Sequence, residues 1–365
     1  MNRILITGCG GHFMKDLVAC LTPYYAVIGA ASRLDPNVAG DLYAYEQVPA
    51  WDDPTYIDVL LGLCAKYDVE VLLPMLDEEL LPLLERRLDF VKTGTALSLT
   101  QSQGLYTAVD KLRFMHFLAK ADIPHPEFRI LEHGDDLIPI AKTLGFPKKP
   151  VCVKATNRSG SRGFRLMDDG FDYYHSFLND KPNSRRIHSR EMKRMLKGKE
   201  LEHIILQEYL PGSEYSTDLL CDNGRVIDIV GRHNVVLDNS IPFESITAYN
   251  KAAYEISEQI VALLELDGNI GFDFIFNEEG APIPIECNPR LTATLSLIAK
   301  SGVNMPMRQV ERLLGFDLPD VEPKYGVKLV RTPLARFENT DDDDTRKPTA
   351  GEEGAPWNPE ERTFF

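Results

Sequence analysis

The sequence lacks an excess of basic residues. Lys and Arg number 40 against 55 Asp and Glu, so the formal net charge of the 365 residues is −15. Because proteins that wrap a nucleic acid carry a basic surface, this composition argues against nucleic acid as a partner. Residues 338–365 hold nine of the acids and three of the bases. We therefore expect the C-terminal segment, 326–365, to end in an acidic tail with little core of its own.

Long apolar runs and paired cysteines are also missing. No apolar stretch approaches the roughly 18 residues of a membrane span, and the chain turns to glycine at Gly8, too early for a signal sequence. The six cysteines are scattered, and no two have the C-x-x-C spacing of a zinc or redox site. Buried thiols in a reducing compartment are the better interpretation. We expect a cytoplasmic protein that makes no contact with membranes.

Short apolar runs alternate with helical patterns over the first hundred residues. The predicted elements are strands at 4–6, 26–31 and 69–73, and helices at 13–21 and 57–64. This alternation predicts a parallel α/β sheet, which we assign to an N-terminal domain over 1–104. The segment Pro74–Glu78, after the third strand, is expected to form one wall of a substrate cleft.

The turn Gly8–Gly11 after the first strand invites a dinucleotide-binding interpretation. No register supplies the third glycine of a G-x-G-x-x-G pattern, because Phe13 occupies that position when the pattern starts at Gly8. A tight strand-to-helix turn explains the glycines equally directly. A nicotinamide oxidoreductase is therefore kept only as an alternative.

A hairpin predicted over 270–288 carries oxygen ligands on one face. Side chains alternate along a strand, so Glu286 shares a face with Asn288, whereas Ile285 points the other way. Pairing across the turn brings Asp273 within a residue or two of the Glu286 register. Unpaired buried carboxylates are costly, which favours a bound cation over a solvated face. Two carboxylates and an amide suit Mg²⁺ that carries phosphate oxygens.

Two lysines stand where an anion is expected. Lys154 lies in the apolar strand predicted at 151–155, where lysine is rare unless its ammonium meets an anion. The following loop, 159–163, can lay backbone amides over phosphates, although its spacing is not that of a Walker A loop. Lys111 opens an amphipathic helix at 111–121, and taken alone it is better explained as a surface lysine.

A strand at 203–207 leads through Pro211-Gly212 into a second strand at 215–221. Such a connection can offer backbone groups to the edge of an adenine, and Glu214 can accept hydrogen bonds from ribose hydroxyls. Taken alone, the segment is also explained as an ordinary loop between strands. Upstream, residues 181–199 hold eight Lys or Arg and one acid, which predicts either a solvated helix over Arg190–Lys199 or a basic flap.

Together these residues resemble the ATP-grasp superfamily over about residues 1–325, and within it the carbamoyl-phosphate-synthase-like and carboxylate–amine ligase branch. The resemblance implies an α/β N-terminal domain, then an ATP-grasp domain over 105–325 whose α+β subdomains, 105–205 and 206–325, clamp ATP. It assigns ATP binding to Lys111, Lys154, Ser159, Gly160, Ser161, Gly163, Gln207, Glu208, Tyr209, Leu210 and Glu214. It assigns the metal to Asp273, Glu286 and Asn288, and catalytic roles to Arg290 and Lys154.

What the resemblance implies is a ligase that uses ATP and Mg²⁺, with Mn²⁺ as an alternative metal. The enzyme would activate a small carboxylate as an acyl phosphate and join it to an amine, releasing ADP and phosphate. Arg232 and His233 are the candidates for holding the carboxylate or acyl phosphate, although they are equally explained as ordinary polar residues of a loop. Many relatives are homodimers, so a homodimer is an expected assembly. The alternatives are carbamoyl-phosphate-type activation of bicarbonate or carbamate, and a non-catalytic ATP-binding regulator.

Overall fold

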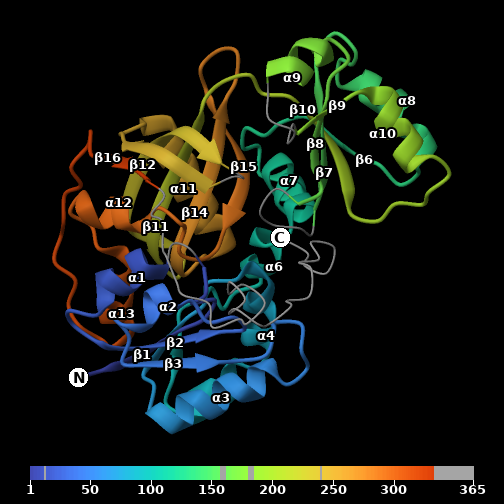
Figure 1. Ribbon diagram of the computed structural model, residues 1–365. Coiled ribbons are helices and arrows are strands. Elements are labelled where there is room, and N and C mark those ends of the chain that lie inside the picture. Colours follow the sequence, from blue (N-terminus) through green and yellow to red (C-terminus); the bar gives the residue numbers. More distant parts are fainter. Residues whose placement is uncertain (12–13, 157–161, 180–184, 239–240, 333–365) are drawn as a thin grey trace, which may run out of the picture. The chain divides into compact units, whose positions relative to one another are not determined.

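Three β-sheets, formed successively along the sequence, organise the chain (Figure 1). The computed structural model describes residues 1–365 except 12–13, 157–161, 180–184, 239–240 and 333–365. Residues Met1–Val330 form one unit, and Arg331–Phe365 form another. The predicted acidic tail over 338–365 therefore lies outside the described residues. Within the described ranges, no helix is long and apolar enough to cross a membrane.

The first sheet is parallel, as the sequence predicts. Its five strands have the order β3-β2-β1-β4-β5. They are β1 (Arg3–Ile6), β2 (Ala26–Ala31), β3 (Ala44–Gln47), β4 (Val71–Leu73) and β5 (Ala96–Leu97). The helices that accompany them are α1 (Met14–Leu21), α2 (Pro36–Ala39), α3 (Tyr56–Tyr67), α4 (Leu80–Glu85), α5 (Arg87–Lys92) and α6 (Gly104–Ala108).

Both faces of this sheet are covered, which explains why its inner strands β2, β1 and β4 are largely apolar. Leu5 packs into a core with Leu60 of α3, whereas Ile4 and Ile6 point to the other face and pack with Leu17 of α1. In Figure 1, α1 and α3 accordingly lie on opposite sides of the strands. The second of these cores also contains Leu291, Leu295 and Val310, so the first sheet packs against residues that follow β15 (Pro282–Asn288) of the third sheet in the sequence.

The glycine turn after β1 is explained by close packing. A Cβ at Gly10 would lie 2.2 Å from the carbonyl oxygen of Arg33, so only glycine fits beside that strand end. The Tyr45 hydroxyl donates a hydrogen bond of 2.7 Å to the carbonyl of Cys9. Contacts within the chain therefore account for the glycine spacing without a dinucleotide.

The second sheet has the order β6-β10-β7-β8-β9. Its strands are β6 (Phe128–Ile130), β7 (Val151–Ala155), β8 (Phe164–Met167), β9 (Arg186–Ile187) and β10 (Ile204–Glu208). The helices of this part of the sequence are α7 (Lys111–Lys120), α8 (Leu137–Thr143), α9 (Tyr173–Asn179) and α10 (Ser189–Leu196). In α10, Met192 and Leu196 are buried while Arg190, Lys193 and Arg194 are exposed, so the basic stretch contains a helix with a solvated face.

The third sheet has the order β15-β14-β11-β12-β13-β16, and its paired neighbours are antiparallel. Its strands are β11 (Glu214–Asp222), β12 (Arg225–Asp238), β13 (Ile241–Thr247), β14 (Gly268–Phe276), β15 (Pro282–Asn288) and β16 (Lys328–Val330). Its helices are α11 (Lys251–Leu264), α12 (Leu295–Lys300) and α13 (Met305–Leu313). Phe272 and Phe274 of β14 and Tyr215 of β11 pack with α11 in one core.

Candidate active site

A cavity of about 540 Å³ is lined by residues of the second and third sheets together with Asp77 and Lys111. Nearly all of the predicted site residues that the structure describes line it. They are Lys111, Lys154, Gly163, Gln207, Glu208, Tyr209, Leu210, Glu214, Arg232, Asp273, Glu286, Asn288 and Arg290. Ser159, Gly160 and Ser161 lie outside the described residues. The sequence thus predicted side chains that meet around one space, although they lie up to 179 positions apart, between residues 111 and 290.

The β14–β15 hairpin places the predicted metal ligands. Asp273 lies directly opposite Glu286 in the strand pairing, and Asn288 lies opposite Gly271. The register shifts after Asp273, because Phe274 pairs with Pro284 and leaves Ile285 as an extra residue. Such a bulge reorients the strand locally, and Ile285 lines the cavity beside Glu286. The prediction that Ile285 points away from this face is therefore wrong, since simple alternation assumes a regular ladder.

Hydrogen bonds and an ion pair hold the carboxylates in place. The Ser216 hydroxyl donates to Asp273 Oδ1 at 2.6 Å, and the Asn288 amide nitrogen donates to Asp273 Oδ2 at 3.0 Å. Lys111 Nζ lies 2.7 Å from Glu286 Oε1. Each carboxylate therefore has a fixed orientation towards its neighbours.

The carboxylates concentrate negative charge in a poorly solvated place. Burial, together with the Glu286 charge, raises the pKa of Asp273, and burial with the Asp273 charge raises the pKa of Glu214 to about 7. A raised pKa of this kind means that the ionised form needs a compensating cation. The described residues include no group of three or more His, Cys, Asp and Glu side chains that would hold a metal alone. Two carboxylates and an amide fit Mg²⁺, which usually takes one or two protein carboxylates and completes its shell with phosphates and water.

Lys154 supplies a positive charge that no described residue pairs with directly. The side chain is partly buried in β7, and its Nζ lies 6.0 Å from the centre of the Phe164 ring. It makes no hydrogen bond or ion pair with any residue that the structure describes. Burial lowers its pKa below the usual range for lysine. An ammonium in this state fits the binding of an anion such as a phosphate.

Another part of the lining is apolar. It is made by Ala155, Phe164, Leu210, Ile275 and Ile285. The carboxylate of Glu214 lines the same cavity and accepts a hydrogen bond of 2.6 Å from the Asn234 amide. A cavity that combines an apolar wall, a hydrogen-bond acceptor and a cluster of charges can take a ligand with a flat ring, hydroxyls and a polyanionic end.

The two residues predicted to bind the substrate differ in position. Arg232 lines the cavity, but it is 3% exposed, and its Nε donates to Asp218 Oδ2 at 2.9 Å. His233 is absent from the described lining, because consecutive residues of a strand point to opposite faces. It packs instead against Tyr215, with ring centres 5.1 Å apart, and burial lowers its pKa. The structure therefore does not bring His233 to the site.

Asp77 lies in the segment predicted to form a wall of the cleft, but motif analysis gave it no role of its own. Its carboxylate binds Arg290 through two hydrogen bonds, 2.6 Å from Nε and 2.7 Å from Nη2, although the residues are 213 positions apart. Asp77 begins a short 3-10 helix, η1 (Asp77–Glu79), directly after the Pro74–Leu76 segment. Asp77 lines the cavity, as the expected wall at Pro74–Glu78 requires. The signal in the sequence was the pair of acids, Asp77 and Glu78, that follows the parallel strand β4. The spacing of residues does not show that Arg290 is the partner of Asp77.

Glu79 fixes the turn that carries Asp77. Its side chain is fully buried and accepts hydrogen bonds from the Thr7 and Tyr56 hydroxyls and from the backbone amides of Met75 and Leu76. A buried carboxylate with this many donors holds the loop after β4 to β1 and α3. The N-terminal sheet thereby positions the group that orients Arg290.

Solved structures show the class of fold to which this arrangement belongs. The ADP complex of N5-carboxyaminoimidazole ribonucleotide synthetase superposes with a TM-score of 0.64 at 15% identity, covering 89% of this chain and 79% of that one. The L-amino acid ligase from Bacillus licheniformis gives 0.61 at 14% identity, covering 86% and 74%. The biotin carboxylase domain of Hydrogenobacter thermophilus 2-oxoglutarate carboxylase gives 0.64 at 17%, covering 90% and 73%. At such identities these similarities establish the fold alone.

Two family models match separate parts of the chain. Residues 200–333 match the model described as ATP-grasp in the biosynthetic pathway with Ter operon, and residues 31–98 match the PylC-like N-terminal domain. The predicted resemblance to the ATP-grasp superfamily is therefore confirmed over residues 200–333, with a PylC-like match ahead of it in the chain. The predicted fold class, a parallel α/β sheet followed by an α+β ATP-grasp domain, is confirmed.

Proposed function

We propose that this protein is an ATP-dependent ligase that activates a small carboxylate as an acyl phosphate and joins it to an amine. The observation that carries the proposal is the cavity in which Lys154, a cation without a described partner, meets the carboxylates of Asp273 and Glu286. Opposite charges gathered in this way suit a metal-bound nucleotide. The domain division at 1–104 and 105–325 and a homodimeric assembly belong to the same proposal.

The lining suggests how ATP would lie. The apolar wall of Phe164, Ile275 and Ile285 would receive the adenine, with backbone groups of Gln207–Leu210 at its edge. Glu214 would accept from the ribose hydroxyls. Lys111 and Lys154 would face the phosphates, and Arg290 would lie close to the γ-phosphoryl group, held there by Asp77.

Such a site works by positioning and electrostatics, because phosphoryl transfer needs no protein nucleophile. A substrate carboxylate oxygen attacks the γ-phosphorus, the bond to the β-phosphate oxygen breaks, and ADP leaves. A neutral amine nitrogen then attacks the acyl carbon, inorganic phosphate leaves, and the nitrogen gives its extra proton to solvent. The lysines and Arg290 spread the negative charge that moves in the first step.

Asp273, Glu286 and Asn288 would hold the magnesium ion. Bound there, Mg²⁺ would neutralise phosphate charge and orient the phosphate oxygens. The present ion pair between Lys111 and Glu286, at 2.7 Å, would then be exchanged for contacts with the nucleotide. The raised pKa of Asp273 supports this assignment, because a bound cation would stabilise the ionised carboxylate in its buried position.

Phosphate and ADP release measured over small carboxylic acids and amino acids, singly and in pairs, tests the proposal. We expect release to require both a carboxylate and an amine, and Glu286→Gln to lower it by about 100-fold or more. Glu278→Gln is the matched control, because Glu278 forms an exposed ion pair with Lys149 at 2.8 Å.

Normal turnover by Glu286→Gln would overturn the assignment of the site. Tight binding of ATP without turnover in any pairing would favour a regulator instead. Release that depends on bicarbonate alone would favour activation of the carbamoyl-phosphate type, and one structural relative is a carboxylase domain whose crystals contain MgADP and bicarbonate.

A further inference from the structure

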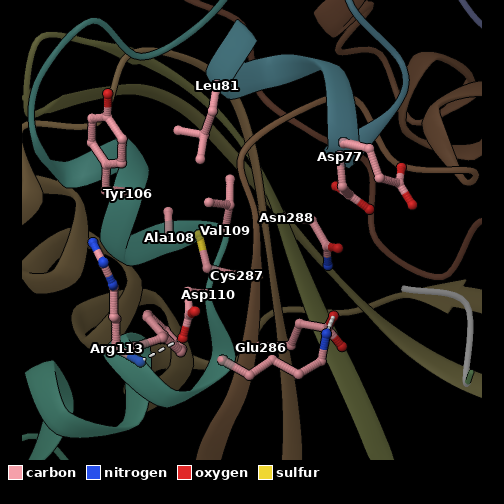
Figure 2. Close-up of a pocket in the computed structure, with 13 residues that line it drawn as sticks. Asp77, Leu81, Tyr106, Ala108, Val109, Asp110, Arg113, Glu286, Cys287 and Asn288 are labelled. Carbon is pink, nitrogen blue, oxygen red and sulfur yellow. Dashed lines mark hydrogen bonds and ion pairs between the residues drawn. The ribbon is translucent and has the colours of Figure 1, made fainter. Parts of the chain in front are cut away.

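A second cavity, of about 280 Å³, adjoins the nucleotide cavity. Figure 2 shows it between Tyr106 and Arg113 on one side and Asp77 and Asn288 on the other, with Leu81 and Val109 between them. The two cavities share four lining residues, Asp77, Lys111, Glu286 and Asn288. The shared residues are those assigned above to the metal, the phosphates and the support of Arg290. The second cavity therefore opens at the reacting end of the first.

The walls of this cavity are largely apolar. They are made by Leu81, Tyr106, Ala108, Val109, Phe114 and Cys287. Pockets for drug-sized ligands measure about 300–1,000 Å³, so this one suits a smaller molecule. Ala108, Phe114 and Cys287 are buried, and α6 and α7 are joined directly through Val109 and Asp110, which gives the cavity a rigid frame.

Acids predominate among the charges that line it. Asp77, Glu78, Asp110 and Glu286 contribute four negative charges, against two positive charges from Lys111 and Arg113. Asp77 is paired with Arg290, Glu286 with Lys111 and Glu78 with Arg162, so Asp110 is the lining acid that makes no ion pair with a described residue. A carboxylate in this state suits a cationic group, such as an ammonium, better than a ligand that presents only a carboxylate. The first substrate of the proposed reaction, a carboxylate, is therefore the poorer fit for this space.

Arg113 provides the one feature that points to an additional anionic group. Its backbone amide donates to Asp110 Oδ1 at 2.9 Å, but its guanidinium makes no ion pair or hydrogen bond with a residue in the described ranges. In Figure 2 it lies across the cavity from Asp77 and Asn288. A guanidinium in this state can bind a carboxylate through two hydrogen bonds.

We propose that the second cavity binds the amine substrate, and that this substrate is a small amino acid with an apolar body. Its amino group would lie at the shared end, its apolar part against Leu81 and Val109, and its carboxylate at Arg113. The proposal rests on the proposed function, because the shared end is reactive only if ATP and the first carboxylate occupy the larger cavity. There the amine nitrogen forms a bond to the acyl carbon, the bond from that carbon to the phosphate oxygen breaks, and the nitrogen releases a proton to solvent.

Calorimetric titration of the full chain, saturated with Mg²⁺ and a non-hydrolysable ATP analogue, tests this site. The probes are valine, leucine, 4-aminobutanoate and 6-aminohexanoate, each compared with the amine that lacks its carboxylate. We expect at least one amino acid to bind, and Val109→Phe to weaken it by about tenfold or more by filling the cavity. The affinity for the ATP analogue should stay within about twofold, since Val109 does not line the larger cavity.

Arg113→Met distinguishes the carboxylate contact from packing, and it is decisive if Val109→Phe does not fold. This variant should lower the affinity for the amino acid and leave the affinity for the corresponding decarboxylated amine unchanged. Lys120→Met, an exposed change on the same helix, should alter neither. If no ATP analogue binds, the proposed function fails. If the analogue binds but no amino acid does, or if both variants bind amino acids normally, the proposal for the second cavity is overturned.

Discussion

Lys154 has different effects on folding and on ligand binding. The fold places its ammonium partly buried in β7, where it makes no ion pair or hydrogen bond with a described residue. Burying an unpaired charge costs free energy, and the lowered pKa of this lysine reflects that cost. Val151 and Val153, which point to the opposite face of β7, are buried in an apolar core, so the packing of the strand on that face does not depend on the charge of Lys154. The residue is therefore better explained by a ligand than by stability.

We predict that Lys154→Met changes stability and nucleotide affinity in opposite directions. Removing the charge should raise the Tm of the ligand-free chain by about 2 °C or more, while the affinity for MgATP falls by about tenfold or more. Thermal unfolding and nucleotide titration measure the two effects. Lys149→Met is the control, because Lys149 is 61% exposed and lies outside the described lining of the cavity. A variant with lower Tm and normal affinity would contradict the prediction.

Glu214 makes stability depend on pH in a direction that can be derived. Burial and the Asp273 charge raise its pKa to about 7, from 4.5 for an ordinary glutamate. The folded chain therefore holds this proton more tightly than the unfolded chain does. The contribution of Glu214 to stability is complete below about pH 4.5 and is lost as the pH rises through about 7.

We predict that Glu214→Gln removes this loss in the ligand-free, chelator-treated protein. The variant should equal the wild type in urea unfolding near about pH 4.5 and exceed it at about pH 8, because the amide oxygen can still accept from Asn234. Glu278→Gln should behave in the opposite sense, since Lys149 lowers the pKa of Glu278. A Glu214→Gln variant that is less stable than the wild type at the higher pH would show that the pKa of the Glu214 carboxylate is not raised in the folded chain.

At the scale of elements, the β14–β15 hairpin and the loop after it act together. Asp218 of β11 accepts a hydrogen bond of 2.5 Å from the Thr292 hydroxyl and one of 2.9 Å from Arg232. Thr292 follows Arg290 by two residues, so this contact fixes the loop that carries the arginine. Gly271 of β14 leaves room for it, because a Cβ there would lie 2.6 Å from Thr292 Cγ2.

We predict that Gly271→Ala lowers the free energy of unfolding by about 1–3 kcal/mol, as overpacking does, and lowers turnover by displacing the Arg290 loop. In the double variant, Thr292→Ser removes the methyl group that clashes but keeps the hydroxyl. This change should restore most of the free energy of unfolding and most of the turnover. Urea unfolding and phosphate release measure the outcomes. Gly62→Ala in α3 meets no atom within 4 Å and should be neutral or stabilising. Failure of Thr292→Ser to rescue would place the strain elsewhere.

Strongly patterned elements could be predicted from the sequence, and weakly patterned ones could not. The apolar run 26–31 matches β2, and the helix predicted at 57–64 corresponds to α3. The strand β3 was not predicted, because Ala44–Gln47 is an edge strand with a polar sequence and little burial. The strand β13 was also not predicted, because Ile241–Thr247 contains a proline and polar residues that weaken the strand pattern.

The same limit applies to the site. Residues whose chemistry conflicts with their strand, such as Lys154 and Asp273, could be singled out from local sequence alone. Asp77 could not be paired with Arg290, because no periodicity relates a loop after β4 to a loop after β15. His233 shows the complementary error. A polar residue next to Arg232 is not on the same side of the strand, and its aromatic neighbours become visible only in the folded sheet.

At the scale of the whole unit, Met1–Val330, the N-terminal sheet is joined to the rest through both packing and polar contacts. Leu291, Leu295 and Val310 share one buried core with Ile4 and Ile6 of β1. Thr100 Oγ1 donates to the carbonyl of Asp267 at 3.0 Å. Together with the Asp77–Arg290 pair, these contacts make the geometry of the site dependent on the intact N-terminal sheet.

We therefore predict that the unit unfolds as one cooperative body. Leu295 is 5% exposed, so Leu295→Ala should lower the free energy of unfolding by about 2–5 kcal/mol. Hydrogen exchange of the backbone amides should show the same loss of protection in β1 and in β14, although α12 follows both in sequence. Leu178→Ala, at a position that is 59% exposed on α9, should change neither. If β1 loses protection while β14 keeps it, the N-terminal sheet opens separately, and its contribution of Asp77 to the site would be a regulated contact rather than a permanent one.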